Sequence, residues 1–137
     1  MTPLSEKLGI EFPVIAAPMF LISNRDMIVA AAEAGIIGAM PSLNCRTAEQ
    51  FEDDLRYIKE RTQKPFGINV TIGLTEPERL KDDVELLMKY EVPVVITSPG
   101  CKVMSWLRCS IISATVKIMV AVLPVCIRLP FTSKDMA

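Results

Sequence analysis

Val14-Ile15-Ala16-Ala17-Pro18-Met19 is a short apolar run that follows Pro13 and stops at a second proline. Its β-branched start and its flanking prolines are typical of a fully buried strand. Pro18 and Met19 then fall at the carboxyl end of that strand. Parallel α/β proteins bind their ligands at this end of the sheet. The run therefore predicts the first strand and the first place to look for a functional site.

The same pattern, an apolar run followed by an amphipathic segment, recurs as far as Gly100. Strands that are apolar throughout and alternate with amphipathic helices indicate a parallel sheet covered by helices. A doubly wound sheet and half of a (β/α) barrel both fit this periodicity. After a helical turn over 3–9, we predict helices at 24–33, 47–60 and 76–90 and further strands at 36–40, 65–70 and 92–97.

Polar residues mark where the predicted helices begin. Ser23 or Asn24 can cap the first helix, and Thr47 with Gln50 forms a capping box at the second. Thr75-Glu76-Pro77-Glu78 has the pattern of another capping box, with proline in the first turn. The helix faces that we expect to be buried consist of Met27, Ile28, Ala31 and Ala34; Phe51, Leu55 and Ile58; and Leu80, Val84, Leu87 and Met88.

Composition excludes several classes of function. The net charge of −1 gives no reason to expect nucleic acid as a partner. The chain has no histidine, which excludes Ser-His-Asp and Cys-His catalysis and zinc sites built on histidine. The start lacks the basic and apolar regions of a signal peptide, so we expect a cytoplasmic protein. The cysteines show no CxxC or metal-ligand spacing and are expected to be free thiols: Cys45, Cys101, Cys109 and Cys126.

The composition changes after Gly100. All six glycines lie within residues 1–100, whereas three of the four cysteines and a single acidic residue, Asp135, lie beyond. We therefore divide the chain into β/α units over 1–100 and a divergent apolar tail over 101–137. The loss of glycine and the reversal of charge suggest a truncated or frame-shifted gene product, or a divergent terminus.

The tail itself predicts little regular structure. Val116–Val120 is a candidate fifth strand. The longest uncharged run in the tail, Ile118 to Ile127, is 10 residues long, and a membrane-spanning helix needs about 20. We therefore expect no membrane anchor, and expect instead that the apolar tail and the exposed sheet edge favour self-association.

Four motifs, in this order along residues 2–100, resemble those of the nitronate monooxygenase family, formerly called 2-nitropropane dioxygenases. That family also contains the flavin-dependent enoyl-ACP reductases. The motifs are Phe12-Pro13-Val14-Ile15-Ala16-Ala17-Pro18-Met19, Ala32-Glu33-Ala34-Gly35-Ile36-Ile37-Gly38, Lys64-Pro65-Phe66-Gly67-Ile68-Asn69 and Val94-Val95-Ile96-Thr97-Ser98.

The resemblance implies a flavin-binding TIM barrel in which FMN lies across the carboxyl ends of the strands. This chain would hold its N-terminal half, four to five parallel βα units of an incomplete barrel. The implied flavin wall packs against the isoalloxazine ring, an amide hydrogen-bonds the polar edge of the flavin, and two hydroxyl residues line the same rim. These residues are Ala17, Pro18 and Met19 for the wall, Asn69 for the amide, and Thr97 and Ser98 for the rim.

The residue types suit these implied roles, although each also has an ordinary structural role. Proline stiffens a loop, methionine offers a polarizable surface, and an amide both donates and accepts. Without the resemblance, Pro18 is a strand stop, Met19 a core residue and Asn69 a turn former. The glycine-rich phosphate loops and the histidine that the family carries in its later strands have no counterpart here, so we assign no catalytic residue.

The implied activity is FMN-dependent oxidation of alkyl nitronates, small-molecule substrates, with dioxygen. Two alternatives stay open: a flavin-dependent enoyl-ACP reductase relative that uses NAD(P)H, and a non-catalytic truncated fragment. A partial barrel leaves a sheet edge unpaired, which would weaken flavin binding. A small membrane-associated protein is the least favoured interpretation.

Overall fold

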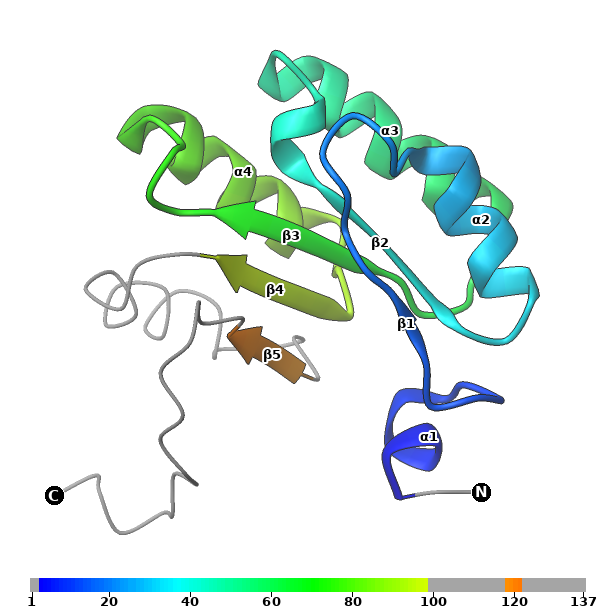
Figure 1. The fold of residues 1–137 in the computed structure, drawn as a ribbon. Coiled ribbons are helices and arrows are strands. Elements are labelled where there is room, and N and C mark those ends of the chain that lie inside the picture. The colour runs from blue at the N-terminus through cyan, green and yellow to red at the C-terminus, as the bar shows by residue number, and fades with distance from the viewer. Residues whose placement is uncertain (1–2, 99–117, 122–137) are drawn as a thin grey trace, which may run out of the picture.

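The computed structural model of the chain describes residues 3–98 and 118–121. Five parallel strands form one sheet in the order β1-β2-β3-β4-β5 (Figure 1). The strands are β1 (Ile15–Ala16), β2 (Ile37–Pro41), β3 (Gly67–Thr71), β4 (Val94–Ser98) and β5 (Ile118–Ala121). The helices are α1 (Pro3–Leu8), α2 (Arg25–Glu33), α3 (Ala48–Arg61) and α4 (Pro77–Lys89), with a 3-10 helix, η1 (Ser42–Asn44), after β2.

The strand order resolves the choice between the two α/β architectures. In a doubly wound sheet the spatial order of the strands reverses at a switch point, so the first strand lies inside the sheet. Here each strand neighbours the next one in sequence, with no reversal. Such an order is the one by which a (β/α) barrel grows, and five of its eight strands are present. The prediction of a partial (β/α)8 barrel is confirmed.

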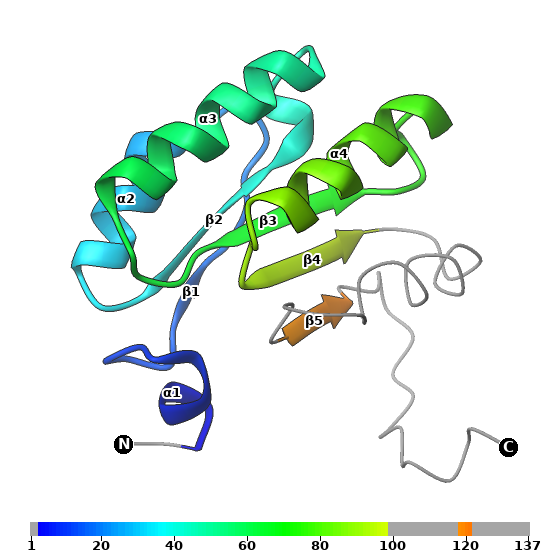
Figure 2. The same ribbon diagram turned by 180° about the vertical axis from the view of Figure 1, so that it is seen from behind.

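The two faces of the sheet carry separate cores. Helices α2, α3 and α4 lie on one face, while α1 lies near the start of β1 (Figures 1 and 2). Alternate strand residues point to the helices or to the opposite, inner face. The helix-side core includes Met40, Ile68, Val70 and Val95 with the helix residues Phe51, Leu55, Ile58, Val84 and Leu87. The inner-face core is Leu8, Ile10, Ile37, Ala39, Val94 and Ile96.

The helix starts follow the predictions in two cases of three. The Asn24 side chain accepts a hydrogen bond from the Met27 backbone N–H at 2.9 Å, and Thr47 accepts one from Gln50 at 3.3 Å. The predicted capping box at Thr75-Glu76-Pro77-Glu78 is wrong. Helix α4 begins after Glu76 with no side-chain cap, because the Thr75 hydroxyl instead donates to the carbonyl of Thr71 at 2.7 Å.

Some burial predictions are also wrong. The first strand is only two residues long, and Val14 and Ile15 are 49% and 37% exposed. Among the described strands β1 pairs with β2 alone, so one of its sides has no strand to cover it. On α4, Met88 is 41% exposed. At α2, Met27 is only partly buried and Ala34, the C-cap residue, is exposed, whereas Ala32 is buried.

The predicted fifth strand is present and pairs with β4. It begins two residues later than predicted, and its bounds are Ile118–Ala121. The remainder of the predicted tail lies outside the described residues, as does the division of the chain at residue 100, which stays a prediction. No helix in the described ranges is long and apolar enough to cross a bilayer.

Candidate functional site

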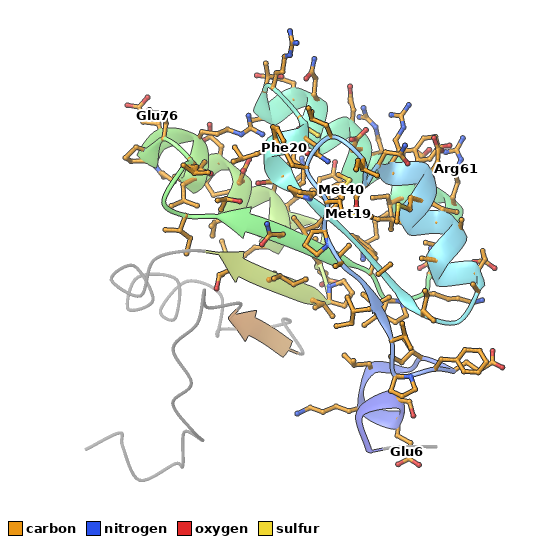
Figure 3. The ribbon with its side chains drawn as sticks, in the orientation of Figure 1. Glu6, Met19, Phe20, Met40, Arg61 and Glu76 are labelled. Atoms are coloured by element: carbon orange, nitrogen blue, oxygen red, sulfur yellow. The ribbon has the colours of Figure 1, made fainter. Side chains whose placement is uncertain are left out.

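The residues implied to bind flavin lie toward the carboxyl end of the sheet, at β1, β3 and β4. Ala17, Pro18 and Met19 follow β1 directly and begin the loop to α2, and Asn69 lies within β3. Figure 3 shows Met19 and Phe20 on this loop, remote from Glu6 on α1 at the other end of the molecule. Met19 is 39% exposed, so it is a surface residue of the rim and not part of the core.

Asn69 faces the inner side of the sheet. In register it lies beside Pro41 of β2 and Ile96 of β4, and Ile96 belongs to the inner-face core. Its side chain is 7% exposed, and its Nδ2 donates to the Thr71 hydroxyl at 3.4 Å. Asn69 therefore brings an amide to the inner face at the level where β3 approaches its carboxyl end.

Thr97 is on the opposite face. It lies beside Val70 in register, and Val70 and Val95 both belong to the helix-side core. Because side chains alternate along a strand, Thr97 points toward the helices, away from the face that carries Asn69. We therefore leave it out of the proposed flavin site. Ser98 pairs with Thr71 at the last position of the β3–β4 ladder.

Ser23 fixes the start of the β1–α2 loop, a role that the sequence pattern did not reveal. Its hydroxyl accepts from the Met19 backbone N–H at 2.9 Å and donates to the Ala17 carbonyl at 3.4 Å. The backbone N–H of Ser23 also donates to the Met19 carbonyl at 3.0 Å. With 2% of its surface exposed, Ser23 closes a turn around the two wall residues Ala17 and Met19.

Asn44, in η1, joins the same loop from the next βα unit. Its Oδ1 accepts from the Leu21 backbone N–H at 2.9 Å. Its Nδ2 donates to the carbonyls of Ser23 at 2.7 Å and Met19 at 3.4 Å. These contacts join residues 21 to 25 positions apart, so no local pattern indicated them.

The loop between these anchors is apolar and exposed. Phe20, Leu21 and Ile22 are 63%, 75% and 65% exposed, and Leu74 in the β3–α4 loop is 77% exposed. Leu21 has φ +60°, a left-handed conformation that costs a residue with a Cβ about 1–2 kcal/mol. The loop therefore holds a strained shape that the Asn44 and Ser23 hydrogen bonds maintain.

A buried ion pair supports η1 from α4. Asp83 is fully buried, and its Oδ1 accepts from Arg79 Nε at 2.6 Å. The Arg79 guanidinium also donates to the backbone carbonyls of Ser42, Cys45 and Arg46 at 3.5, 3.3 and 3.0 Å. A guanidinium presents five donors in a fixed fork, so one residue can bind the segment at several points.

Cys45, beside this pair, is a structural thiol. Its Sγ donates to Asp54 Oδ2 at 3.3 Å. Burial, and then the negative charge of Asp54, raise the pKa of Cys45 to about 12. A thiol with so high a pKa stays protonated, and a protonated thiol is a poor nucleophile. Cys45 is therefore a free cysteine, as predicted, without the environment of a catalytic one.

These residues can hold a ring but cannot transfer a proton. Ala17, Pro18 and Met19 offer apolar surface, and Asn69 offers one amide donor and acceptor. A flat aromatic cofactor with a polar edge fits this combination. Within 3–98 and 118–121 no three His, Cys, Asp or Glu residues group as metal ligands would. A hollow of about 520 Å³ lies at the other end of β3 and β4, against Lys59, Phe66 and Pro93.

The strand order defines the class, a β/α-barrel chain, and the candidate site lies at the carboxyl ends of β1 and β3. The family model described as nitronate monooxygenase matches residues 1–118. The chain belongs to this family, which confirms the resemblance inferred from the four motifs. The family is one of flavin-dependent oxidoreductases.

Two curated relatives have similar sequences. A Mycobacterium tuberculosis protein named (3aS,4S,5R,7aS)-5-hydroxy-7a-methyl-1-oxo-octahydro-1H-indene-4-carboxyl-CoA dehydrogenase is 32% identical over 93 residues, which are 68% of this chain and 25% of the relative. A Staphylococcus aureus protein named "probable nitronate monooxygenase" is 29% identical over 123 residues, and the match covers 66% of this chain and 34% of the relative. The chain thus spans about a quarter to a third of the length of these relatives.

Solved structures share the fold. FabK from Thermotoga maritima superposes with a TM-score of 0.73 at 24% identity, over 88% of this chain and 37% of FabK. Nitroalkane oxidase from Streptomyces ansochromogenes superposes with a TM-score of 0.64 at 20% identity, over 88% of this chain and 42% of the oxidase. Both superpositions cover less than half of the larger protein, in agreement with a partial barrel.

Proposed function

We propose that this chain forms one side of an FMN site in an oxidoreductase that oxidises alkyl nitronates with dioxygen. The observation that carries the proposal is the placement of Asn69 on the inner face of β3, at the same end of the sheet as the exposed Ala17–Met19 segment. Family membership supports a flavin as the ligand. FMN would supply the electron transfer when bound, and the protein would supply its position.

The described residues would act on the ring by contact and hydrogen bonding. Ala17, Pro18 and Met19 would cover part of one ring face and exclude water from it. The Asn69 amide would hydrogen-bond the polar edge, where an amide can serve both a carbonyl and an N–H of the ring. Ser98, at the carboxyl end of β4, is the remaining rim candidate.

A reductase function is the second candidate, and a specific observation favours it. FabK and the enoyl reductase domain of MlnA from Bacillus amyloliquefaciens are both structural neighbours, with TM-scores of 0.73 and 0.65. In this version the same flavin wall would serve a reduction of an enoyl thioester by NAD(P)H. The two versions share the cofactor and differ in substrate.

Oxygen uptake separates the two activities. The full chain, incubated with FMN and freed of excess, would be given an alkyl nitronate in air, and separately NADPH with an enoyl thioester. The proposal expects dioxygen consumption with the nitronate and no NADPH oxidation dependent on the thioester. NADPH oxidation dependent on the thioester, without dioxygen consumption, would establish the reductase. No activity in either assay, from a protein that retains no FMN, would establish the non-catalytic fragment.

The partner and location assignments are proposals as well. We propose a small-molecule substrate, a cytoplasmic location, and self-association through the uncovered side of β1, where Val14 and Ile15 are exposed. An exposed edge strand with apolar side chains is a ready surface for pairing with another chain. Sedimentation of the purified chain at several concentrations measures this association.

A further inference from the structure

We propose that Asn44 is a positioning residue for the flavin site: it holds the Met19–Ser23 turn in one shape and thereby fixes the Ala17–Met19 wall. The inference rests on the proposed FMN site and adds a residue to it from a different βα unit. Asn44 belongs to η1, after β2, and is not part of the wall itself.

The contacts of Asn44 are all with backbone atoms of the turn. Its side-chain oxygen accepts from the Leu21 N–H at 2.9 Å, and its side-chain nitrogen donates to the carbonyls of Ser23 at 2.7 Å and Met19 at 3.4 Å. One planar amide thus engages three residues of the turn. Asparagine is suited to this role because it carries an acceptor and two donors on a short side chain.

The shape that Asn44 holds is one that the turn would not keep alone. Leu21 has φ +60° and a side chain that is 75% exposed, so no packing holds it there. A left-handed leucine persists only where surrounding contacts over-determine it. The hydrogen bond from the Leu21 N–H to Asn44 fixes the backbone at that residue. Without it, the turn has fewer constraints against relaxing to an ordinary conformation.

The position of Asn44 is itself fixed from the opposite direction. Arg79 on α4 donates to the carbonyls of Ser42 and Cys45, on either side of Asn44, at 3.5 and 3.3 Å. The buried Asp83 holds Arg79 at 2.6 Å. A continuous set of polar contacts therefore runs from α4 through η1 to the β1–α2 loop. Asn44 is the link in it that touches the loop.

Hydrogen bonds connect the Ala17–Met19 wall directly to this turn. Met19 is a wall residue, and its carbonyl accepts from Asn44 and from the backbone of Ile22 and Ser23. Its N–H donates to the Ser23 hydroxyl, which also reaches the Ala17 carbonyl. Loss of the Asn44 amide would therefore loosen the segment that is proposed to cover the flavin ring, and would do so without removing any atom that touches the ring.

The test uses the full chain with three variants. Asn44→Ala removes every side-chain contact, Asn44→Asp keeps the acceptor for Leu21 and loses the donors, and Gln63→Ala is the matched control. Gln63 also uses its amide to bind a backbone carbonyl, that of Lys59 at 3.2 Å, but lies at the opposite end of the strands. Two quantities are measured: exchange of the Leu21 amide hydrogen without FMN, and the FMN dissociation constant from flavin fluorescence.

The proposal expects Asn44→Ala to speed exchange at Leu21 and to weaken FMN binding by about ten-fold, with a smaller loss for Asn44→Asp and none for Gln63→Ala. The urea midpoint of each variant shows that global folding is retained. If Asn44→Ala binds FMN as tightly as the wild type, the positioning role of Asn44 is overturned and the proposed FMN site is not. Failure of the wild-type chain to bind FMN would overturn the proposed function itself, and the role of Asn44 with it.

Discussion

The helix-covered side of the sheet and the rim at β1 are held together by different forces. On the helix side, Phe51, Leu55 and Ile58 are 0% exposed, and burial of apolar surface stabilises the contacts of α3 with the sheet. At the rim, Phe20 and Leu21 are 63% and 75% exposed, and the loop is fixed by hydrogen bonds to Ser23 and Asn44. The scaffold is therefore specified by hydrophobic pattern, and the candidate site by polar contacts between βα units.

The same substitution in both regions should give very different effects. Phe51→Ala empties a fully buried position and should lower the free energy of unfolding by about 3–5 kcal/mol. Phe20→Ala, at 63% exposure, should change it by less than about 0.5 kcal/mol. Urea unfolding followed by circular dichroism measures both. Equal losses for the two variants would contradict the division into a buried scaffold and an open rim.

Gly38→Ala should be the next largest effect, because α2 lies directly on β2 at this point. An added Cβ would lie 2.8 Å from the Ile28 Cα and 2.9 Å from the Ala31 Cβ, so the helix must shift. We expect a loss of about 2–3 kcal/mol.

Gly9→Ala is the control for this substitution. Nothing lies within 4 Å of the Cβ that it adds, and its cost of about 1–2 kcal/mol comes from φ +68° alone. A Gly38→Ala protein as stable as the wild type would show that α2 does not pack closely on the sheet.

Cys45 makes stability depend on alkaline pH. Its folded pKa, raised to about 12 by burial and by Asp54, exceeds that of an unfolded cysteine. The folded state therefore binds the thiol proton more tightly. The resulting stabilisation is complete below the unfolded pKa and is lost as pH rises from there toward the folded pKa.

Between about pH 8 and about pH 10 the wild type should therefore lose about 2 kcal/mol more stability than Cys45→Ala, in which no thiol titrates at this position. Urea midpoints of the two proteins at both pH values give the difference. Parallel losses would mean that the Cys45 thiol is not buried beside Asp54.

Glu91→Gly should give the smallest effect, and a favourable one. Glu91 follows the end of α4 with φ +47°, where glycine is preferred. Glycine removes the strain of this backbone conformation but has a higher conformational entropy in the unfolded chain. We expect the net effect to stabilise the protein by about 0.5 kcal/mol. A thermal unfolding midpoint that falls instead would show that the Glu91 side chain has a role that outweighs its strained backbone.

The sequence pattern predicted the order and type of the elements because each depends on local periodicity. The stripe Phe51, Leu55, Ile58 is fully buried, and the caps at Asn24 and Thr47 are present. The family motifs then distinguished the barrel from a doubly wound sheet, which periodicity alone left open. The strand order confirms that choice.

The features that the pattern could not predict depend on how residues far apart in the sequence are arranged in the fold. An apolar run does not say which residue starts the alternation, so the sequence does not show that Thr97 faces the helices while Asn69 faces the inner side. The exposure of Val14 and Ile15 depends on whether a strand covers β1. Asn44 reaches residues far away in sequence, so its link to Met19 and Leu21 required the structure.

Titration of the full chain with FMN tests the central claim most directly, namely that the carboxyl rim at β1 and β3 is a flavin wall. We expect saturable quenching of flavin fluorescence with one FMN per chain. Asn69→Leu should weaken binding by about ten-fold, and Gln63→Leu, at the other end of the strands, should leave it unchanged. Failure of the wild-type chain to bind FMN, or equal affinity in Asn69→Leu, would contradict the claim.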